Sequence, residues 1–483
     1  MQHKNIDLIP TYLYLSKMSW RRRPASLISY HSPRYDQQNL RALLEDFEGL
    51  KYVFVQWVDF MGQLRTRCLP IADFTKLIQA GDAFAISYGN LGTLQNDHLT
   101  SVCVPVGSIY VEPDIYLDSL RPMQSHGPIQ DAATVMAGFV EESGDRHKLC
   151  PRSALQTTLD IFNNEHHVWF LVGFEIEITF CKRVASDGGT TFDPLDTVHA
   201  WSTFSDQQYM DGMPIMLHIA STLKEIGIDV SQVHSEAGPG QYEFVLPPLP
   251  PVHAVDTLYQ ARQCITQMAA VHGLRATCHA QPFPGIGTAA HAHISLNSTS
   301  RCTEDLEERF QPYFVSGIIT HFPALCAFML PQAVSYNRVV DDSWTSGTWI
   351  AWGTQNREVP VRKSGQLRWE LRCLDGFANM YLALHAIFSA ALWAVGRGTP
   401  LMQGDCTRNP SQMSEEERTN LGIVSKLPAS IDKALEAAEK EVALEGIMSK
   451  GILKHYLAMK KEEQKMLGEM DEGERRIWLM ERY

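Results

Sequence analysis

Two glutamates stand two residues apart in an otherwise apolar segment. Glu175 and Glu177 lie in GFEIEITF, which has the composition and alternation of a β-strand. Residues two apart on a strand project to the same face, so these carboxylates would lie side by side. Burying such a pair is costly unless a cation offsets the charge. Taken alone, the segment is equally compatible with a solvated strand face.

A glycine-rich turn supplies two further carboxylates. In HSEAGPGQYEFVL, Glu236 precedes Gly-Pro-Gly and Glu243 lies on the strand that follows. A hairpin with this turn can bring both carboxylates near one point, although a plain hairpin with charged flanks has the same pattern. The sequence therefore predicts a hairpin here and allows a second cluster of acids.

Histidines and a charged pair follow on later strands. In FPGIGTAAHAHISL, a loop containing Gly287 leads to His291 and His293 on one strand face. Either histidine could be a metal ligand, although one of such a pair is more often packed in a core. In LRWELRCLDGF, Glu370 and Arg372 share a strand face, for which an internal ion pair is the alternative explanation.

Together these segments indicate a site for hard divalent cations and phosphate. A set rich in carboxylates suits Mg²⁺ or Mn²⁺ far better than zinc. Arginines that could bind phosphate or carboxylate groups follow downstream: Arg338, Arg357, Arg362, Arg368 and Arg372. Carboxylate-held metals beside arginines are what phosphoryl transfer requires. The sequence contains no Walker-type glycine loop with its lysine, which disfavours a P-loop ATPase.

The elements that must position these residues form two regions after an extension at residues 1–37, which we expect to be poorly ordered. Residues 38–145 predict a small α+β domain with a helical pattern at 40–47, a strand–turn–strand in KYVFVQWVDFMGQLRTRCLP, and strands at SVCVPV and SIYVEPD. Residues 146–483 predict a catalytic domain of mixed strands and helices, with helices at 213–226 and 254–271. Its last part, after Leu427, should be mostly helical.

Bulk composition excludes several classes of protein. The 483 residues are 45% hydrophobic and 20% charged, which is typical of a globular chain. A net charge of -13 disfavours nucleic-acid binding. Ten cysteines without CxxC pairs indicate neither a disulfide framework nor a zinc knuckle, so we expect a cytoplasmic protein. The longest apolar stretch, 381–395, is too short to span a membrane, so no membrane partner is expected.

The order of the motifs resembles that of the glutamine synthetase superfamily. FEIEITF, EAGPGQYE, GTAAHAHISL, QNREVPVR and RWELR occur in the order of the family's motifs, and the resemblance extends from about residue 40 to the C-terminus. It implies an α+β fold with a β-grasp-like N-terminal domain, an α/β catalytic domain and a helical C-terminus. It also implies an ATP-dependent ligase that joins the γ-carboxyl of glutamate to ammonia or a small amine through a γ-glutamyl phosphate. Members form ring-shaped homo-oligomers, which we expect here too.

The same resemblance implies roles for individual residues. One Mg²⁺ or Mn²⁺ ion would be held by Glu177, Glu236 and Glu243, and a second by Glu175, His291 and Glu370. Glutamate would be bound by Gly287, Arg338 and Arg372. ATP and the transferred phosphate would be bound by Arg357, Arg362 and Arg368. His234 would lie at the amine end, and the catalytic residues would be Arg357, Arg338 and His234. We expect His293 to be structural.

Two positions depart from the family pattern. Ile86 stands in AISYGNLG where the family has an aspartate that helps to bind ammonium, and Trp344 stands where it has a flap glutamate. An ammonium ion needs a nearby negative charge and a base. We therefore expect a larger or less polar amine. Two alternatives stay open: a true glutamine synthetase that uses Asp341, Asp342 or Asp97 instead, and a non-catalytic structural or regulatory oligomer. An unrelated metal-dependent hydrolase is disfavoured by the arginines and the motif order.

Overall fold

The computed structural model describes residues 49–483, except 116–118, 187–188, 286, 442–443, 445, 447 and 449. The expected extension at residues 1–37 and the helical pattern at 40–47 lie outside this described part. Two β-sheets organise the described residues, one formed before residue 141 and one after residue 167.

The first sheet contains the predicted hairpin. Its elements are β1 (Tyr52–Val58), β2 (Leu64–Pro70), α2 (Ile71–Ala80), β3 (Phe84–Ser87), the 3₁₀ helix η1 (Tyr88–Gly92), β4 (Ser108–Pro113), β5 (Arg121–Pro122) and β6 (Ala132–Val140). The strand order is β2–β1–β6–β4–β3, with β5 paired to β6. β1 and β2 are antiparallel, and their turn includes Gly62 at φ 81°, a conformation that glycine adopts without a steric penalty.

One predicted strand in this region is wrong. Residues 101–106 (SVCVPV) form turns and irregular backbone, in which the Cys103 N–H donates to the Thr100 carbonyl at 2.9 Å. Pro105 has no N–H to donate to a strand ladder, so the apolar alternation of the segment is not sufficient for pairing. At this edge of the sheet β3 pairs with β4.

The second sheet is built around one long strand. Its strands are β7 (Val168–Ser186), β8 (Gly189–Pro194), β9 (Gln232–Ser235), β10 (Gln241–Val245), β11 (Leu274–Thr277), β12 (Ala292–Ser298), β13 (Trp352–Thr354), β14 (Val361–Gly365) and β15 (Arg368–Leu371). The order is β13–β14–β15–β12–β7–β10–β9, and β8 and β11 also pair with β7. The predicted strands at LVGFEIEITF, QYEFVL, LRATCHA and HAHISL are thereby confirmed.

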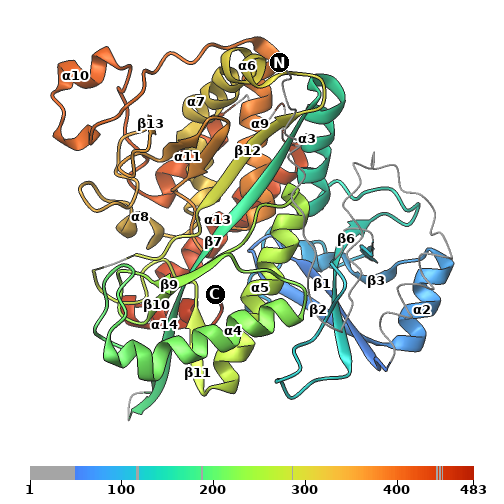
Figure 1. The fold of residues 1–483 in the computed structure, drawn as a ribbon. Coiled ribbons are helices and arrows are strands. Elements are labelled where there is room, and N and C mark those ends of the chain that lie inside the picture. Colours follow the sequence, from blue (N-terminus) through green and yellow to red (C-terminus); the bar gives the residue numbers. More distant parts are fainter. Residues whose placement is uncertain are drawn as a thin grey trace, which may run out of the picture. The chain divides into compact units, whose positions relative to one another are not determined.

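The helices that support this sheet follow the predicted pattern. They are α3 (Pro151–His166), η2 (Gln208–Gly212), α4 (Met213–Glu225), α5 (Pro251–Val271), α6 (Thr303–Asp305), η3 (Leu306–Phe310), α7 (Gln311–Met329), α8 (Ser335–Arg338), α9 (Met380–Arg397), η4 (Pro410–Gln412), α10 (Glu415–Asn420), α11 (Ile431–Lys440), α13 (Lys450–Gly468) and α14 (Glu472–Met480). Figure 1 shows α7, α9 and α11 grouped beside β12. The predictions of helices near 213–226 and 254–271 and of a helical C-terminal part are confirmed.

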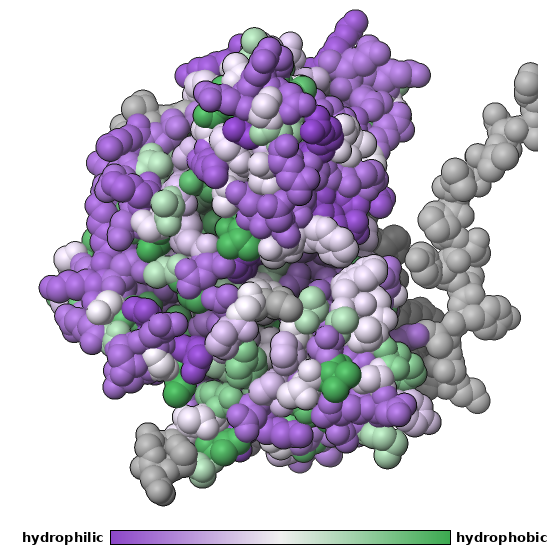
Figure 2. Space-filling model, turned by 90° about the vertical axis from the view of Figure 1, so that its left-hand side faces the viewer, coloured by the Kyte–Doolittle hydropathy of each residue, from purple (hydrophilic) through white to green (hydrophobic). Residues whose placement is uncertain are grey.

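The core of the second region lies between these helices and the sheet. Two helical stretches, Thr303–Met329 and Met380–Arg397, are long and apolar enough to cross a membrane, but 78% and 72% of their most apolar windows lie inside the protein. Burial of this kind is what core helices of globular proteins show. The side of the protein seen in Figure 2 is mostly hydrophilic, with hydrophobic side chains in small groups. The predicted α+β fold is confirmed, while the boundaries at 38–145 and 146–483 stay a prediction.

Candidate active site

The candidate site is built on the middle of β7. Glu175 and Glu177 occupy the same face of this strand, as the spacing predicts. The antiparallel register places Glu243 of β10 opposite Glu177, and places His293 of β12 opposite Glu370 of β15. Strands on both sides of β7 therefore bring the predicted ligands from four separate motifs to one part of the sheet.

A first cluster joins Glu175 to two histidines and Glu370. The His291 Nδ1 atom lies 2.8 Å from a Glu175 oxygen and 3.6 Å from a Glu370 oxygen, while His293 Nε2 lies 2.9 Å from the other Glu175 oxygen. Ligand atoms of Glu175, His293 and Glu370 all lie within 4.8 Å of one another. The structure thus places His293 beside the predicted ligands, although the sequence suggested only a structural role.

The carboxylates of this first cluster are stabilised as anions. Burial opposes ionisation of Glu175, but hydrogen bonds with His291 and His293 outweigh it and lower the pKa of the carboxyl. Burial also opposes ionisation of Glu370, and there Arg372 and the two histidines lower the pKa. Both groups are therefore charged at neutral pH and able to bind a cation.

A second cluster contains Glu236, Glu243 and His234. His234 Nε2 lies 3.3 Å from Glu236 and 3.8 Å from Glu243, and ligand atoms of the three side chains lie within 4.8 Å of one another. Glu177 lies between the clusters: one of its oxygens is 3.7 Å from His291 Nδ1, and the other accepts hydrogen bonds from the Ala289 N–H at 2.7 Å and from Gln241 Nε2 at 3.2 Å.

Unlike the carboxyls of the first cluster, Glu243 and the adjoining Glu177 have raised pKa values. Burial, and to a smaller extent the neighbouring glutamates, raise the pKa of Glu243 to about 10. Burial likewise raises the pKa of Glu177. Carboxyls that are this desolvated and this close together ionise readily only beside a positive charge. The donor set fits Mg²⁺ or Mn²⁺, because it combines carboxylate oxygens with one or two imidazoles.

Three of the predicted arginines surround these clusters. Glu370, which is 1% exposed, accepts hydrogen bonds from Arg362 at 2.7 Å and from Arg372. Arg338 is 3% exposed and donates to the Leu374 carbonyl at 2.8 Å. The Nε atoms of Arg338, Arg362 and Arg372 are buried without a hydrogen-bond partner in the described part of the chain. Unused donors of this kind are suited to an anionic ligand.

Gly287 has a steric reason to be glycine. A Cβ atom at this position would lie 2.3 Å from Arg338 Cβ and 3.2 Å from the Ala280 carbonyl oxygen. The backbone here also accepts a hydrogen bond from Gln241 Nε2 at 3.1 Å. Gly287 and Arg338, both expected to bind glutamate, are therefore direct neighbours. Arg357 and Arg368, by contrast, have exposed side chains.

A fixed loop carries Trp344 next to the arginines. The Trp344 N–H donates to Glu358 Oε1 at 2.9 Å, and its carbonyl accepts from Arg372 Nη2 at 2.7 Å. Asp342, Trp344 and Ser346 have φ angles of 61°, 55° and 82°, a region that costs non-glycine residues about 1–3 kcal/mol each. The loop bonds hold this strained backbone in place, while the Trp344 side chain stays 69% exposed.

The acids proposed as alternatives for ammonium binding have other partners. Asp341 accepts from the Thr348 N–H at 2.7 Å and from its hydroxyl at 2.9 Å. Asp342 accepts from side chains on the neighbouring segment, namely Asn409, Ser411 and Gln412. Asp97 lies 3.0 Å from Arg65 in the first region, and Ile86 is a buried residue of β3. Both flap aspartates therefore anchor the loop.

Sequence reasoning missed Gln241 and Glu358. Gln241 lies in the Gly-Gln-x-Glu hairpin and hydrogen-bonds both Glu177 and Gly287, so its place in that motif was an available signal. Glu358 directly follows Arg357, and its Oε2 atom is buried without a hydrogen-bond partner among the described residues. An acid next to an arginine is ordinarily explained as a surface charge, so only the structure distinguishes it.

Comparison with known proteins extends these observations. The family profile described as "Glutamine synthetase, catalytic domain" matches residues 148–477. Protein fluG of Emericella nidulans is 38% identical over 91% of this chain, which spans 50% of that protein. Glutamine synthetase of Methanocaldococcus jannaschii is 27% identical over 86% of this chain and 92% of its own. Gamma-glutamylpolyamine synthetase GlnA3 of Streptomyces coelicolor is 26% identical over 81% of this chain and 84% of its own.

A solved structure agrees at the level of the fold. GmaS in complex with ADP superimposes with a TM-score of 0.73 at 23% identity, covering 91% of this chain and 99% of that one. The profile match covers more than half of the chain and includes both clusters and all the predicted arginines. The expectation of a glutamine synthetase-type ligase domain is thereby confirmed, and the chain belongs to the glutamine synthetase family.

Proposed function

We propose that this chain is an ATP-dependent ligase that forms a γ-glutamyl amide from glutamate and an organic amine through a γ-glutamyl phosphate. The observation that carries the proposal is the convergence of two carboxylate–histidine clusters on the paired strands β7 and β10, beside three arginines with unused donors. A catalytic centre needs such a grouping, whereas a purely structural relative gains nothing from bringing six acids and histidines together with two of the glutamates buried. This argues against a non-catalytic oligomer.

The residues have separate roles at the phosphate-binding end and at the amine end of the site. Mg²⁺ or Mn²⁺ held by the acid clusters would neutralise charge on the phosphates during transfer. Arg338, Arg372 and the close approach at Gly287 position the glutamate. Arg362, bound to Glu370, presents a guanidinium towards the phosphates, and exposed Arg357 and Arg368 bind ATP from the open side. His234, 3.3 Å from Glu236, borders the place where the amine attacks.

The acceptor is an organic amine for reasons of local geometry. The carboxylates of Asp341 and Asp342 are hydrogen-bonded to Thr348 and Asn409. Trp344 offers an exposed indole at the position of the family's flap acid. An indole surface favours an acceptor with an apolar portion. The similarity to a gamma-glutamylpolyamine synthetase supports this reading, whereas the equal similarity to a glutamine synthetase keeps ammonia as the alternative acceptor.

Phosphate release from ATP, measured with Mg²⁺, glutamate and a panel of amines, tests the proposal. The parent should turn over with primary alkyl or aryl amines and only slowly with ammonium, and Glu236→Gln should be inactive with all of them. Trp344→Ala should lower kcat/KM for bulky amines more than for methylamine. Efficient turnover with ammonium alone would make the chain a glutamine synthetase. Binding of ATP without turnover on any amine would overturn the proposed activity.

We also propose that the chain assembles as a ring-shaped homo-oligomer in the cytoplasm. Two groups of exposed apolar side chains support assembly, one on the loop and helix at 198–210 and one in the first region: Val198, Trp201, Phe204, Tyr209 and Met210, then Leu99, Val104 and Val106. Exposed apolar side chains that lie close together often mark interfaces. Light scattering should give a mass several times that of the chain, and Phe204→Glu should reduce it. A monomeric parent would contradict the assembly.

A further inference from the structure

Glu358 is an acid that neither the metal clusters nor the arginine set accounts for. The residue is 9% exposed, and its Oε1 atom accepts a hydrogen bond from the Trp344 N–H at 2.9 Å. Its Oε2 atom is buried and lacks a hydrogen-bond partner within the part of the chain that the structure describes. Leaving a buried carboxylate oxygen unpaired is unfavourable, so a hydrogen-bond donor from a ligand would be stabilising here.

Glu358 lies close to the glutamate end of the site. Trp344 connects Glu358 to Arg372 at this end, because its N–H is bound to Glu358 and its carbonyl is bound to Arg372. These two hydrogen bonds, across one residue of backbone, keep the Glu358 carboxylate within about 9 Å of the Arg372 guanidinium. Arg372 in turn binds Glu370 of the first cluster. The Glu358 carboxylate is therefore at the edge of the reaction centre and bound to the backbone of the exposed Trp344.

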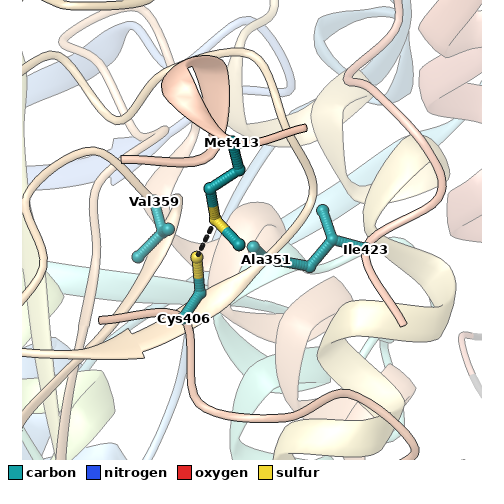
Figure 3. Close-up of a cluster of buried hydrophobic side chains, with 5 residues drawn as sticks. All are labelled: Ala351, Val359, Cys406, Met413 and Ile423. Carbon is teal, nitrogen blue, oxygen red and sulfur yellow. Dashed lines mark hydrogen bonds between the residues drawn. The ribbon is translucent and has the colours of Figure 1, made fainter. Parts of the chain in front are cut away.

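The backbone behind Glu358 is held firmly. Its N–H donates to Asn356 Oδ1 at 2.9 Å, and Asn356 Nδ2 donates to the Cys406 carbonyl at 2.7 Å. The next residue, Val359, is buried in a hydrophobic cluster with Cys406 and three other side chains, shown in Figure 3. A charged group that is positioned in advance by its supporting contacts is typical of binding and catalytic sites.

We propose that Glu358 is the acid of the acceptor end, and that the acceptor is a primary organic amine bound in its ammonium form. This inference rests on the proposed ligase function and specifies its substrate class. Oε2 accepts a hydrogen bond from the –NH₃⁺ group, while the organic part of the amine lies along Trp344. Glu358 supplies at a new position the negative charge that Ile86 and Trp344 do not.

The proposed step transfers one proton before the amide bond forms. The ammonium group gives a proton to the Glu358 carboxylate, which becomes a carboxylic acid, and the neutral amine then has a free electron pair. The nitrogen attacks the γ-carbonyl carbon of the acyl phosphate, the C–O bond to phosphate breaks, and phosphate leaves with that bond's electron pair. The second nitrogen proton is lost to the departing phosphate, which completes the amide.

Glu358→Gln tests this step, because it keeps an oxygen for the Trp344 N–H and removes the charge. Hydroxylamine is a second acceptor that is largely neutral at pH 7, so it needs neither an anion for docking nor a base before attack. General-base assistance contributes about 100-fold or more. The variant should therefore lose about 100-fold or more in kcat/KM for a primary alkylamine and retain hydroxamate formation from hydroxylamine within a few-fold. Glu415→Gln, an exposed acid on α10, should match the parent with both acceptors.

The outcomes separate this inference from the proposed function. Equal losses with alkylamine and hydroxylamine would mean that Glu358 only supports the loop or the fold, and would overturn the inference. Unchanged alkylamine turnover would overturn it as well. A parent that forms no amide and no hydroxamate would instead remove the ligase function itself. Glu358→Asp should recover part of the alkylamine activity, since it restores the charge on a shorter side chain.

Discussion

Replacement of Glu243 by glutamine should have opposite effects on stability with and without divalent cations. Burial and neighbouring glutamates raise the pKa of Glu243 from its ordinary value of 4.5 to about 10 in the folded chain. A group with a raised folded-state pKa stabilises the fold fully below pH 4.5, and this contribution is lost as the pH rises towards 10. At pH 7 the gap from 4.5 corresponds to about 3 kcal/mol, at 1.36 kcal/mol per pH unit.

Without cations, Glu243→Gln should therefore be more stable than the parent at pH 7, by up to about 3 kcal/mol, and equal to it near pH 4.5. With Mn²⁺ the order should reverse, because a cation that binds the folded parent stabilises it by mass action and the variant lacks one ligand. Urea denaturation with a chelator or with Mn²⁺, at pH 5 and pH 7, measures both effects.

The exposed residue Glu142 provides a matched control, since Glu142→Gln should not change the stability of the protein either with chelator or with Mn²⁺. A Glu243→Gln variant that is less stable than the parent in chelator at pH 7 would refute the electrostatic reasoning. Equal stabilisation of both proteins by Mn²⁺ would refute the assignment of Glu243 as a ligand.

Two further substitutions probe the glutamate end. Gly287→Ala would place a methyl group 2.3 Å from Arg338 Cβ, so Arg338 must move and kcat/KM for glutamate should fall about 100-fold; Gly396→Ala, where no atom lies within 4 Å, should have no such effect. Arg372→Lys keeps the charge but loses the forked contact with Glu370 and Trp344, so kcat/KM for glutamate should fall about 10- to 100-fold, and an unchanged value would show that the Trp344 contact is dispensable.

Much of the site was predictable because strand periodicity is local. The spacing of Glu175 and Glu177 and the turn before Glu243 determine which way the side chains point, and the structure agrees on both. What periodicity does not determine is which distant strands become neighbours. The contact between His293 and Glu175 arises from the β12–β7 register, and local sequence offered no means to choose between His291 and His293.

Loop contacts were harder to anticipate than strands. The predicted strand at 101–106 failed because Pro105 weakens pairing, although the segment alternates in polarity. The roles of Asp341 and Asp342 depend on side chains at Thr348 and Asn409, the latter 67 residues away from Asp342. Identifying Glu358 as a candidate required knowledge of its burial, because atoms from other segments determine its surroundings.

The long strand β7 also has a consequence for how the chain folds. Its partners β10, β11 and β12 come from much later in the sequence, and β15 is joined to it only through β12. Pairings between distant segments form slowly, because the entropy of closing a large loop is lost before the stabilising contacts form. The first cluster needs several of these closures, because Glu175, His293 and Glu370 come from β7, β12 and β15, whereas the second lies within the β9–β10 hairpin. A cation that binds the first cluster should therefore bind only after these strands have paired, and its binding during refolding should follow the slowest sheet-forming phase.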